Sequence, residues 1–475
     1  MGVDGLWSLV NPVGKQVNLE CCKGKRIAVD LSAWVVQCST VARNIPTAFI
    51  CCRGLFMRTL NLLSLGISLV FVIDGPSAPA IKKKVKNREV FYREVMEFKE
   101  LLTALGLPVL ECVGEAEKMC AQLNHLNLVD GVLTNDGDAL IYGAQTVYKG
   151  LFQDSKNLTA TEYNMADVTA NLNLTRRDLI AFALLSAGDF SDGVPNVRDK
   201  KFAELIKEFK KNNIEDALDR FLSWSSNSEL DSLDNKKQSL IGIKKKHCTK
   251  CSHEGTKQGH NKSGCTCCQV DFDCNESSSP GHPPCSCEYH VLEETVKAYK
   301  TELKLRELAL KSNANFPDQA IIAEFLGPLP IELTSVNLSL NIPDFKTVCR
   351  VLKKKLHFSD ANTMSFLVPA TIKMAFHGLL PDLTIRPMCI IRACKYKFEQ
   401  CFLVRWQKFD QDEFSDDESF YEIKFSQEVF TLKYPEIVDQ FEGTSTHAVK
   451  QNSAKLAQSK MTSYFNTVKL DKPHK

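Results

Sequence analysis

The sequence predicts an α/β fold with a mostly parallel central sheet, followed by a helical subdomain, a small β module and a polar tail. Three short apolar runs rich in β-branched residues, at 26–30, 68–74 and 131–136, read as buried strands. Between them, residues 56–65 and 91–105 carry apolar side chains at helical spacing. Buried strands alternating with helices are typical of a doubly wound parallel sheet.

The rest of the chain changes character several times. From about residue 175 the pattern is helical, and a loop with Gly193 and Pro195 precedes a basic amphipathic stretch at 200–211. Residues 244–290 are rich in Cys, His, Gly and Ser, so we expect an insertion stabilised by something other than an apolar core. Helical patterns resume at 291 and at 344–375. Runs at 400–406 and 420–425 predict two strands around an acidic loop, and the polar composition after Gly443 predicts a disordered tail.

Composition limits the class of protein. The chain has 475 residues and is 44% hydrophobic, which is enough for a globular core. Its formal charge of +2 indicates no nucleic-acid partner by itself, so any such partner must be recognised by local basic clusters. No apolar run is long enough to cross a bilayer, and the N-terminus lacks the pattern of a signal peptide. We therefore expect no membrane partner, and expect the 19 cysteines to be reduced thiols or metal ligands.

Acidic residues gather where the predicted strands end. Because the carboxyl ends of parallel strands share one edge of a sheet, we expect these side chains to lie together. Others reach the same edge from the start of a predicted helix at 116–126 and from the end of an apolar helix. The set is Asp30, Asp74, Glu115, Glu117, Asp136, Asp138 and Asp189.

So many carboxylates would raise one another's pKa and oppose folding unless divalent cations lay between them. Oxygen ligands suit Mg²⁺, with Mn²⁺ as a substitute, and two such ions activate water and stabilise the leaving oxygen of a phosphodiester. The residues thus predict metal-assisted phosphoryl transfer to water. A lone Asp after a strand is more often a helix cap, and a small phosphatase could carry a similar edge, so the carboxylates do not specify DNA.

Six short motifs indicate a protein family in which that chemistry occurs. They lie at residues 1–7 (MGVDGLW), 27–30 (IAVD), 71–75 (FVIDG), 114–117 (GEAE), 136–138 (DGD) and 188–190 (GDF). In this order they resemble the flap-endonuclease (XPG/Rad2) superfamily. The resemblance implies a PIN-like nuclease core that binds metal through the seven acidic residues, with Gly2 at the DNA. It also implies a helix-hairpin or helix-two-turn-helix DNA-binding subdomain. The implied domains are the XPG N-terminal region 1–96, the XPG internal region 97–190, the helical subdomain 191–380 with its Cys/His-rich insertion 244–290, a chromodomain-like module 385–442 and the tail 443–475.

Within the superfamily the chain resembles the GEN family. Only 40 residues separate Asp74 from Glu115, which leaves little room for the arch that threads a free 5′ end. The resemblance implies a nuclear endonuclease of DNA repair and recombination that dimerises on four-way Holliday junctions and also cuts 5′ flaps and replication forks. The alternatives are a monomeric 5′-flap or gap endonuclease and a non-catalytic adaptor bound to chromatin or a sliding clamp.

Basic residues supply the expected DNA contacts. The family carries a Lys and an Arg seven residues apart near the scissile phosphate, and the matching positions here are Ile81 and Arg88, with Lys82 next to the first. We expect Arg88 and Lys82 to act in catalysis, and Lys83, Lys84 and Lys86 to bind DNA, although such a run is commonly just a solvated face. In the hairpin the family has glycines where this chain has Asn196 and Arg198. Duplex binding by Arg198, Lys200 and Lys201 is expected with altered geometry, a lost potassium site or weakened affinity.

The insertion has Cys and His residues at zinc-ligand spacing. The candidate ligands are Cys248, Cys251, His253, Cys265, Cys268, Cys285, Cys287 and His290, and His260, Cys267 and Cys274 lie among them. A surface loop with unpaired thiols is the alternative. The sequence does not determine which four residues would bind which ion.

Two further motifs lie near the C-terminus. Trp406 and Phe409 match the aromatic step of chromodomains, where aromatic side chains cage a methylated lysine, but packing in a core explains them equally well. Gln458, Met461, Tyr464 and Phe465 match the sliding-clamp binding box, in which a single turn gathers the apolar side chains. Chance occurrence in a polar tail is the alternative.

Overall fold

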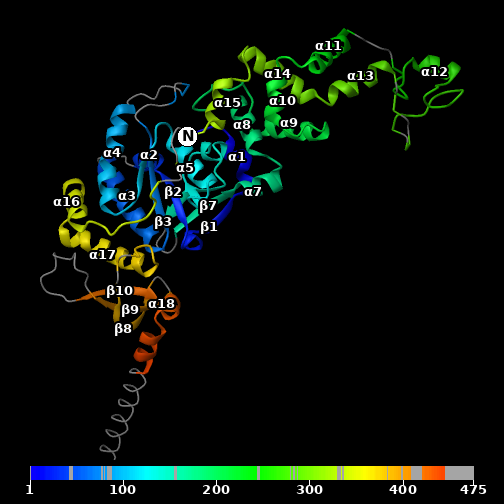
Figure 1. The fold of residues 1–475 in the computed structure, drawn as a ribbon. Coiled ribbons are helices and arrows are strands. Elements are labelled where there is room, and N and C mark those ends of the chain that lie inside the picture. The colour runs from blue at the N-terminus through cyan, green and yellow to red at the C-terminus, as the bar shows by residue number, and fades with distance from the viewer. Residues whose placement is uncertain are drawn as a thin grey trace, which may run out of the picture.

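Figure 1 shows the chain as an elongated molecule with a central α/β body, a helical arm on one side and a small β module on the other. The structure is a computed structural model. It describes residues 2–41, 47–75, 79, 81–82, 88–153, 158–242, 247–278, 280–281, 284–285, 287–328, 333, 336–381, 383, 385–396, 399–407 and 420–443. No helix among these residues is long and apolar enough to cross a membrane.

A seven-stranded sheet forms the centre of the α/β body, with strand order β1-β7-β6-β5-β2-β3-β4. Strands β2 to β6 pair in parallel, and β7 and β1 add an antiparallel edge. The mostly parallel sheet predicted from the sequence is therefore confirmed. The strands are β1 (Lys15–Asn18), β2 (Arg26–Asp30), β3 (Ser68–Ile73), β4 (Val109–Glu111), β5 (Gly131–Leu133), β6 (Thr146–Gln153) and β7 (Leu158–Asn164).

Helices cover both faces of this sheet because alternate strand residues point to opposite sides. In β3, Val70 and Val72 pack into one core while Leu69, Phe71 and Ile73 pack into the other. The helices of the body are α1 (Leu6–Val10), α2 (Leu31–Val41), α3 (Thr47–Ser64), α4 (Arg88–Ala104), α5 (Ala116–His125), α6 (Asp138–Ile141), α7 (Met165–Asp167) and α8 (Arg176–Leu185), with short turns η1 (Asn11–Val13), η2 (Leu19–Cys22) and η3 (Val168–Leu172). Residues of α1, α5, α6 and α8 belong to the first core, and those of α2, α3 and α4 to the second.

The helical arm extends from α8, and α12 lies at its far end (Figure 1). Its helices are α9 (Asp199–Lys211), α10 (Ala217–Ser223), α11 (Ser228–Gly242), α12 (Lys257–Ser263), α13 (Glu288–Lys297), α14 (Lys300–Ser312) and α15 (Gln319–Leu326). Buried ion pairs fix the arm. The fully buried Glu302 accepts hydrogen bonds from Arg220 at 2.6 Å and from Trp224 Nε1 at 2.9 Å.

Two helices that the sequence groups with the helical subdomain lie elsewhere. Helices α16 (Phe345–Leu356) and α17 (Asp360–Phe376) pack against α3 and α4 of the α/β body, far from the arm. The backbone N–H of Asp344 donates to the carbonyl of Ala104 at 2.8 Å, and Arg350 pairs with Glu100 at 2.8 Å. Periodicity predicts a helix and its apolar face but not the partner of that face. The helical unit expected at 191–380 is therefore divided between the arm and the body.

The C-terminal module is a three-stranded antiparallel sheet with strand order β10-β9-β8, followed by a helix. Its elements are β8 (Pro387–Tyr396), β9 (Glu399–Gln407), β10 (Phe420–Ser426) and α18 (Gln427–Lys433). Two strands were expected here, and β8 is the third. Trp406 is 1% exposed and packs against Phe425 and Phe376, with ring centroids 5.2 and 6.4 Å away. The Trp406 side chain thus belongs to the core that joins the module to α17, and it is not available to a surface cage. Phe409 lies outside the described residues.

Trp406→Ala is expected to open this module selectively. Truncating a buried Trp costs about 3–5 kcal/mol, so the amides of β9 and β10 should exchange with deuterium about 100-fold faster or more. Met388→Ala, at a 55% exposed position of β8, is the matched control and should leave exchange nearly unchanged. Equal protection in the two variants would contradict this packing.

Candidate active site

Acidic residues from several strands and from the start of a helix meet at the carboxyl edge of the parallel strands. Asp30 is the last residue of β2, Asp74 follows β3, and Asp136 follows the turn after β5. That strand ends at Leu133, earlier than expected, because the backbone N–H of Asp136 turns back to Thr134 Oγ1 at 3.0 Å. Glu115 is the N-cap of α5 and Glu117 lies in its first turn.

Local hydrogen bonds orient these carboxylates. Asp74 Oδ1 accepts from the N–H of Ala116 at 2.8 Å, which ties β3 to the start of α5. Asp30 Oδ1 accepts from the N–H of Ala33 at 3.0 Å and so caps α2. Each contact fixes one oxygen of the carboxylate.

Most of the acidic side chains are deeply buried, although anionic groups are rarely buried without a partner. Asp30 is 0% exposed and its Oδ2 atom has no hydrogen-bond partner among the described residues. Ligand oxygens of Asp74, Glu115 and Glu117 lie within 4.8 Å of one another. These residues are buried, lie close together and offer only oxygen ligands. They therefore fit divalent cations such as Mg²⁺ or Mn²⁺.

The pKa values of the buried carboxyls reflect this crowding. Burial, together with the charge of Asp74, raises the pKa of Asp30 to about 7. Burial and the charge of Asp30 raise the pKa of Glu117 well above its usual range. Burial and the charge of Asp136 do the same for Asp138. Bringing these groups together therefore costs folding free energy that bound cations would offset.

The N-terminus forms one wall of the site. The backbone N–H of Val3 donates to Asp138 Oδ1 at 2.8 Å, and Gly2 has φ of +79°. A Cβ atom at Gly2 would lie 2.1 Å from Asp136 Oδ1 and 2.5 Å from Asp138 Oδ1. Only glycine fits there, and Gly2, which was expected to contact DNA, lies against two of the carboxylates.

Lys82 lies among the carboxylates. Its Nζ is 2.5 Å from Glu115 Oε2 and 3.1 Å from Asp189 Oδ2, which brings Asp189 to the same site. Burial alone would lower the pKa of Lys82, but the charges of Glu115 and Glu117 outweigh it and the pKa is raised. The neighbouring Ile81 packs into the apolar core. The structure thus brings Lys82, and not Ile81, to the carboxylates.

The hairpin before α9 presents the second group of expected contacts. Asn196 has φ of +62°, the left-handed conformation for which glycine is usual, whereas Arg198 is extended at φ −143° and needs no glycine. Arg198 and Lys200 are exposed. Lys201 Nζ donates to the carbonyl of Asn196 at 2.6 Å and so braces the loop. Both substitutions of the family glycines are therefore compatible with the hairpin.

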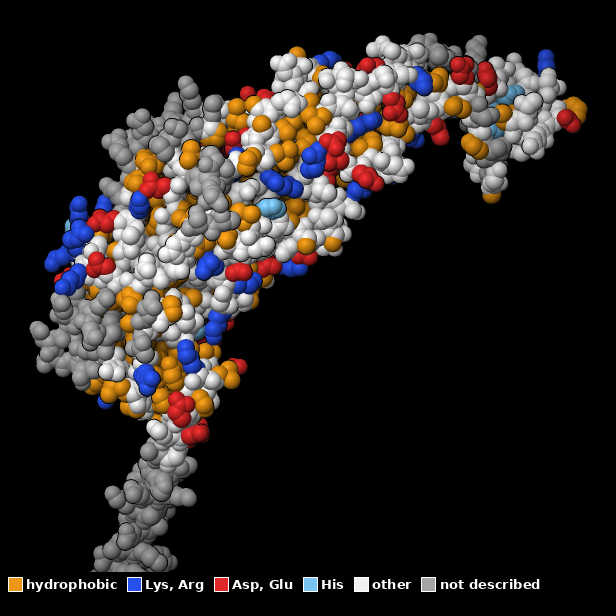
Figure 2. Space-filling view, viewed as in Figure 1, with side chains coloured by type: hydrophobic (Ala, Val, Ile, Leu, Met, Phe, Trp, Pro, Cys, Tyr) orange, Lys and Arg blue, Asp and Glu red, His pale blue; other side chains and the backbone are white. Residues whose placement is uncertain are grey.

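A further basic surface was not anticipated from the sequence. Figure 2 shows Lys and Arg side chains gathered at one edge of the molecule over α16. Lys346, Arg350, Lys353 and Lys354 are exposed there. The amphipathic pattern of residues 345–356, with lysines opposite the buried face, was the signal that could have indicated it.

Several expected residues cannot be placed. Lys83, Lys84 and Lys86 lie outside the described residues, as does the clamp-binding motif of Gln458, Met461, Tyr464 and Phe465. Arg88 is the first residue of α4, but its side chain is not described. Between Asp74 and Glu115 the described residues hold α4 and β4, with no separate arch.

Known proteins share this arrangement. The chain matches the XPG N-terminal domain over residues 1–93 and the XPG I-region over residues 106–189. Flap endonuclease GEN-like 1 of Arabidopsis thaliana is 30% identical over 458 residues, which cover 86% of this chain and 75% of that protein. This chain belongs to the GEN family of XPG/Rad2 nucleases. Flap endonuclease GEN homolog 1 of Homo sapiens is also 30% identical to this GEN-family chain, covering 92% of the chain and 50% of the human protein.

The GEN-family chain spans about half the length of its human and mouse relatives. A crystal structure of human GEN1 in complex with Holliday junction DNA has a TM-score of 0.65 at 24% identity and covers 95% of this chain and 100% of that one. The catalytic core of Rad2 in complex with DNA has a TM-score of 0.54 at 24% identity and covers 78% of this chain. These likenesses establish the nuclease fold.

Proposed function

We propose that this chain is a metal-dependent, structure-specific endonuclease that cleaves Holliday junctions and related branched DNA. The observation that carries the proposal is the convergence of Asp74, Glu115 and Glu117, whose ligand oxygens lie within 4.8 Å of one another. Beside them, Asp30 Oδ2 is buried and has no hydrogen-bond partner among the described residues. Membership of the GEN family makes DNA the expected substrate for that site.

The residues divide into roles by position. Asp74, Glu115 and Glu117 would hold one ion. We assign Asp136, Asp138 and Asp189 to a second ion, with Asp30 completing the set. Two Mg²⁺ ions would polarise the attacking water and stabilise the leaving oxygen of the phosphodiester. Lys82, which pairs with Glu115 and Asp189, supplies positive charge beside the phosphate, and we assign Arg88 the same role.

The short chain between Asp74 and Glu115 supports junctions over threaded flaps, since the described part of it contains only α4 and β4. A four-way junction has two equivalent strands to cut, so a dimer of this chain would place one site at each. Nuclear action and clamp binding through the C-terminal tail belong to the same proposal.

Hairpin residues are expected to bind phosphates without reading sequence. For Arg198→Ala/Lys200→Ala, the slope of log affinity against log salt should fall by about two, because each lost phosphate contact removes about one released counterion. Fluorescence anisotropy in EDTA, with junction DNA over a salt series, measures it. Lys300→Ala/Lys304→Ala, at two exposed positions of α14, removes the same charge and is the control; an equal change there would assign the effect to overall charge.

Substrate choice can be tested with the purified chain and an Asp30→Asn control in Mg²⁺. Labelled four-way junctions, 5′ flaps, forks and single strands would be compared under single-turnover conditions. Faster cutting of junctions than of single flaps is the expected result. Preferential flap cutting by a monomer would favour the 5′-flap nuclease, and absence of metal-dependent cutting on every substrate would favour a non-catalytic adaptor.

A further inference from the structure

The insertion at the tip of the arm has a core made of sulfur in place of hydrocarbon. Its buried cluster consists of five cysteines, against which Cys267 and Val270 pack. The cysteines are Cys248, Cys251, Cys265, Cys268 and Cys274. His253 and His260 are also buried there, at 1% and 8% exposed. A segment with this little apolar surface cannot fold on burial alone.

We propose that residues 247–290 bind three zinc ions, two of which share the thiolate of Cys251. Three groups of four Cys and His side chains have their ligand atoms within 4.8 Å of one another. The groups are Cys248, Cys251, His260 and Cys274; Cys251, His253, Cys265 and Cys268; and His247, Cys285, Cys287 and His290. His247 was not among the candidate ligands read from the sequence. His260 and Cys274, which the sequence places among the candidates without a role, belong to the first group.

The spacing within each group fits a tetrahedral zinc ion. Zinc bonds of about 2.3 Å to sulfur and about 2.0–2.1 Å to nitrogen imply ligand atoms about 3.5–3.8 Å apart. The Sγ atoms of Cys248 and Cys274 are 3.5 Å apart, and Cys251 Sγ is 3.3 Å from His260 Nδ1. A disulfide would need about 2.05 Å, so these sulfurs are arranged around a common centre and not bonded to each other.

The second group has the same dimensions. His253 Nδ1 lies 3.4 Å from Cys265 Sγ and 3.3 Å from Cys268 Sγ. Because Cys251 belongs to both groups, two separate tetrahedral sites cannot form without sharing its sulfur. A thiolate has lone pairs enough to bridge two ions, which yields two sites of three sulfurs and one nitrogen each.

Backbone geometry supports metal binding independently. Each close cysteine pair, Cys248–Cys251 and Cys265–Cys268, is followed by a residue with positive φ, Ser252 at 58° and Gln269 at 53°. Non-glycine residues adopt this conformation at a cost and keep it where the surroundings enforce it. The N–H of Lys250 also points at Cys248 Sγ, 3.4 Å away. Each turn thus directs the sulfurs of its own two cysteines toward one point.

The histidine tautomer is also set for metal binding. His260 Nε2 lies 3.0 Å from the carbonyl of Glu254, to which it can only donate. The proton is then on Nε2, and Nδ1 presents its lone pair to the Cys251 sulfur group.

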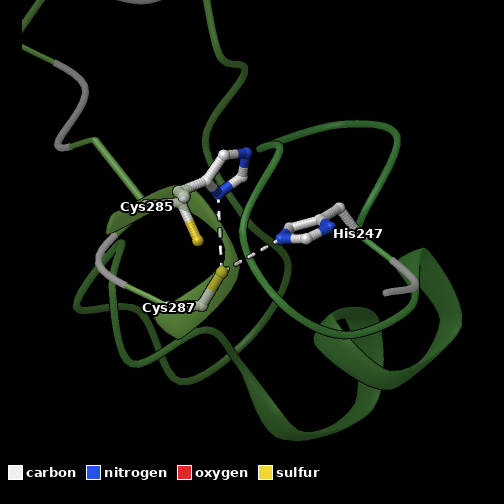
Figure 3. Close-up of side chains that lie close together, drawn as sticks. His247, Cys285 and Cys287 are labelled. Atoms are coloured by element: carbon white, nitrogen blue, oxygen red, sulfur yellow. Dashed lines mark hydrogen bonds between the residues drawn. The ribbon is translucent and has the colours of Figure 1, made fainter. Parts of the chain in front are cut away.

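The third group closes the neck of the insertion. Figure 3 shows His247, Cys285 and Cys287 pointing toward one another, and His247 Nε2 is 3.3 Å from Cys287 Sγ. Cys287 is the N-cap of α13, and His290 Nδ1 in the first turn is 3.5 Å from the same sulfur. His247 begins the insertion and the others end it, so an ion here would fasten its two ends to α13.

Metal counting on the full-length chain tests the proposal. Inductively coupled plasma mass spectrometry, in excess Mg²⁺ to keep zinc from the carboxylates, should find three zinc ions per chain. Cys287→Ser or Cys265→Ser should lose one ion and Cys251→Ser two. Cys267→Ser, in the same turn but in none of the groups, is the matched control and should keep three. Two ions in the wild-type protein, or three in Cys251→Ser, would overturn the shared thiolate.

X-ray absorption on the wild-type protein provides a second readout that needs no variant to fold. The three groups require twice as many Zn–S as Zn–N bonds. A spectrum dominated by Zn–O bonds would place the zinc at the acidic site and overturn the proposal. A failure of the zinc proposal leaves the cleavage proposal standing, because the insertion lies at the far end of the arm from the α/β body (Figure 1).

Discussion

Asp30→Asn is expected to lower the single-turnover rate of junction cleavage by at least about 10³-fold, equivalent to roughly 4 kcal/mol of activation free energy. Asparagine keeps the shape of the side chain and the cap on α2, through Oδ1 and the N–H of Ala33. It removes a negative charge from a buried carboxyl that feels the charge of Asp74. The loss should therefore come from the chemistry and not from unfolding.

The same substitution should stabilise the metal-free protein, which makes the prediction two-sided. The pKa of Asp30 is raised on folding from 3.8 to about 7 by burial and by Asp74. A carboxyl with a raised folded pKa favours folding at low pH, and this contribution is lost as pH rises from about 4 to about 7. In EDTA, the melting temperature of Asp30→Asn should exceed that of the wild type at pH 8, with the difference shrinking toward pH 4. A variant that is less stable at pH 8 would contradict the electrostatic account.

Gly2→Ala is expected to slow cleavage by about 100-fold, the order of loss that an ångström-scale displacement of catalytic groups produces. The added methyl group would meet Asp136 Oδ1 at 2.1 Å and Asp138 Oδ1 at 2.5 Å, so either the N-terminus or both carboxylates must shift. In Mg²⁺ titrations of the cleavage rate, the variant should reach half-saturation at a higher Mg²⁺ concentration than the wild type.

Gly24→Ala is the control that distinguishes a steric clash of the added methyl group from strain in the backbone. Gly24 has φ of +80°, close to the value at Gly2, but a Cβ atom there would meet nothing within 4 Å. Its variant should share any cost of the left-handed conformation and retain cleavage. If both variants lost activity equally, steric contact with Asp136 and Asp138 would not be the cause.

The sequence predicts much of this site because strand ends and acidic residues coincide. Asp30 and Asp74 each end a continuous apolar run that is typical of a buried strand, and the parallel sheet then brings them together without further information. The N-terminal motif assigns Gly2 to DNA contact, whereas its close approach to two carboxylates is a property of packing that the sequence does not show. The family pattern matches Ile81, and Lys82 was expected to take its place from the next position. The structure brings Lys82 to the carboxylates while Ile81 packs against the apolar core.

What the sequence could not supply were partners distant in the chain. Residues 345–376 are recognisably helical, yet nothing local indicates that they pack on α3 and α4. In the insertion, spacing identifies two close cysteine pairs, but the pairing of Cys251 with His260 and Cys274 depends on how the loops fold back. The sequence pattern does not predict strand β8, because the buried and exposed residues of this strand do not alternate regularly. Its pairing with β9 also contains register shifts.

The most direct test of the central claim maps the incisions made in a four-way junction with all strands labelled in turn. The proposed mechanism predicts symmetrical nicks in two opposed strands, dependent on Mg²⁺ or Mn²⁺, absent with Asp30→Asn, and leaving 5′-phosphate and 3′-hydroxyl ends that ligase can reseal. Cleavage that persists in EDTA, or in the Asp30→Asn protein, would contradict the assignment of the carboxylates to metal-dependent hydrolysis of branched DNA.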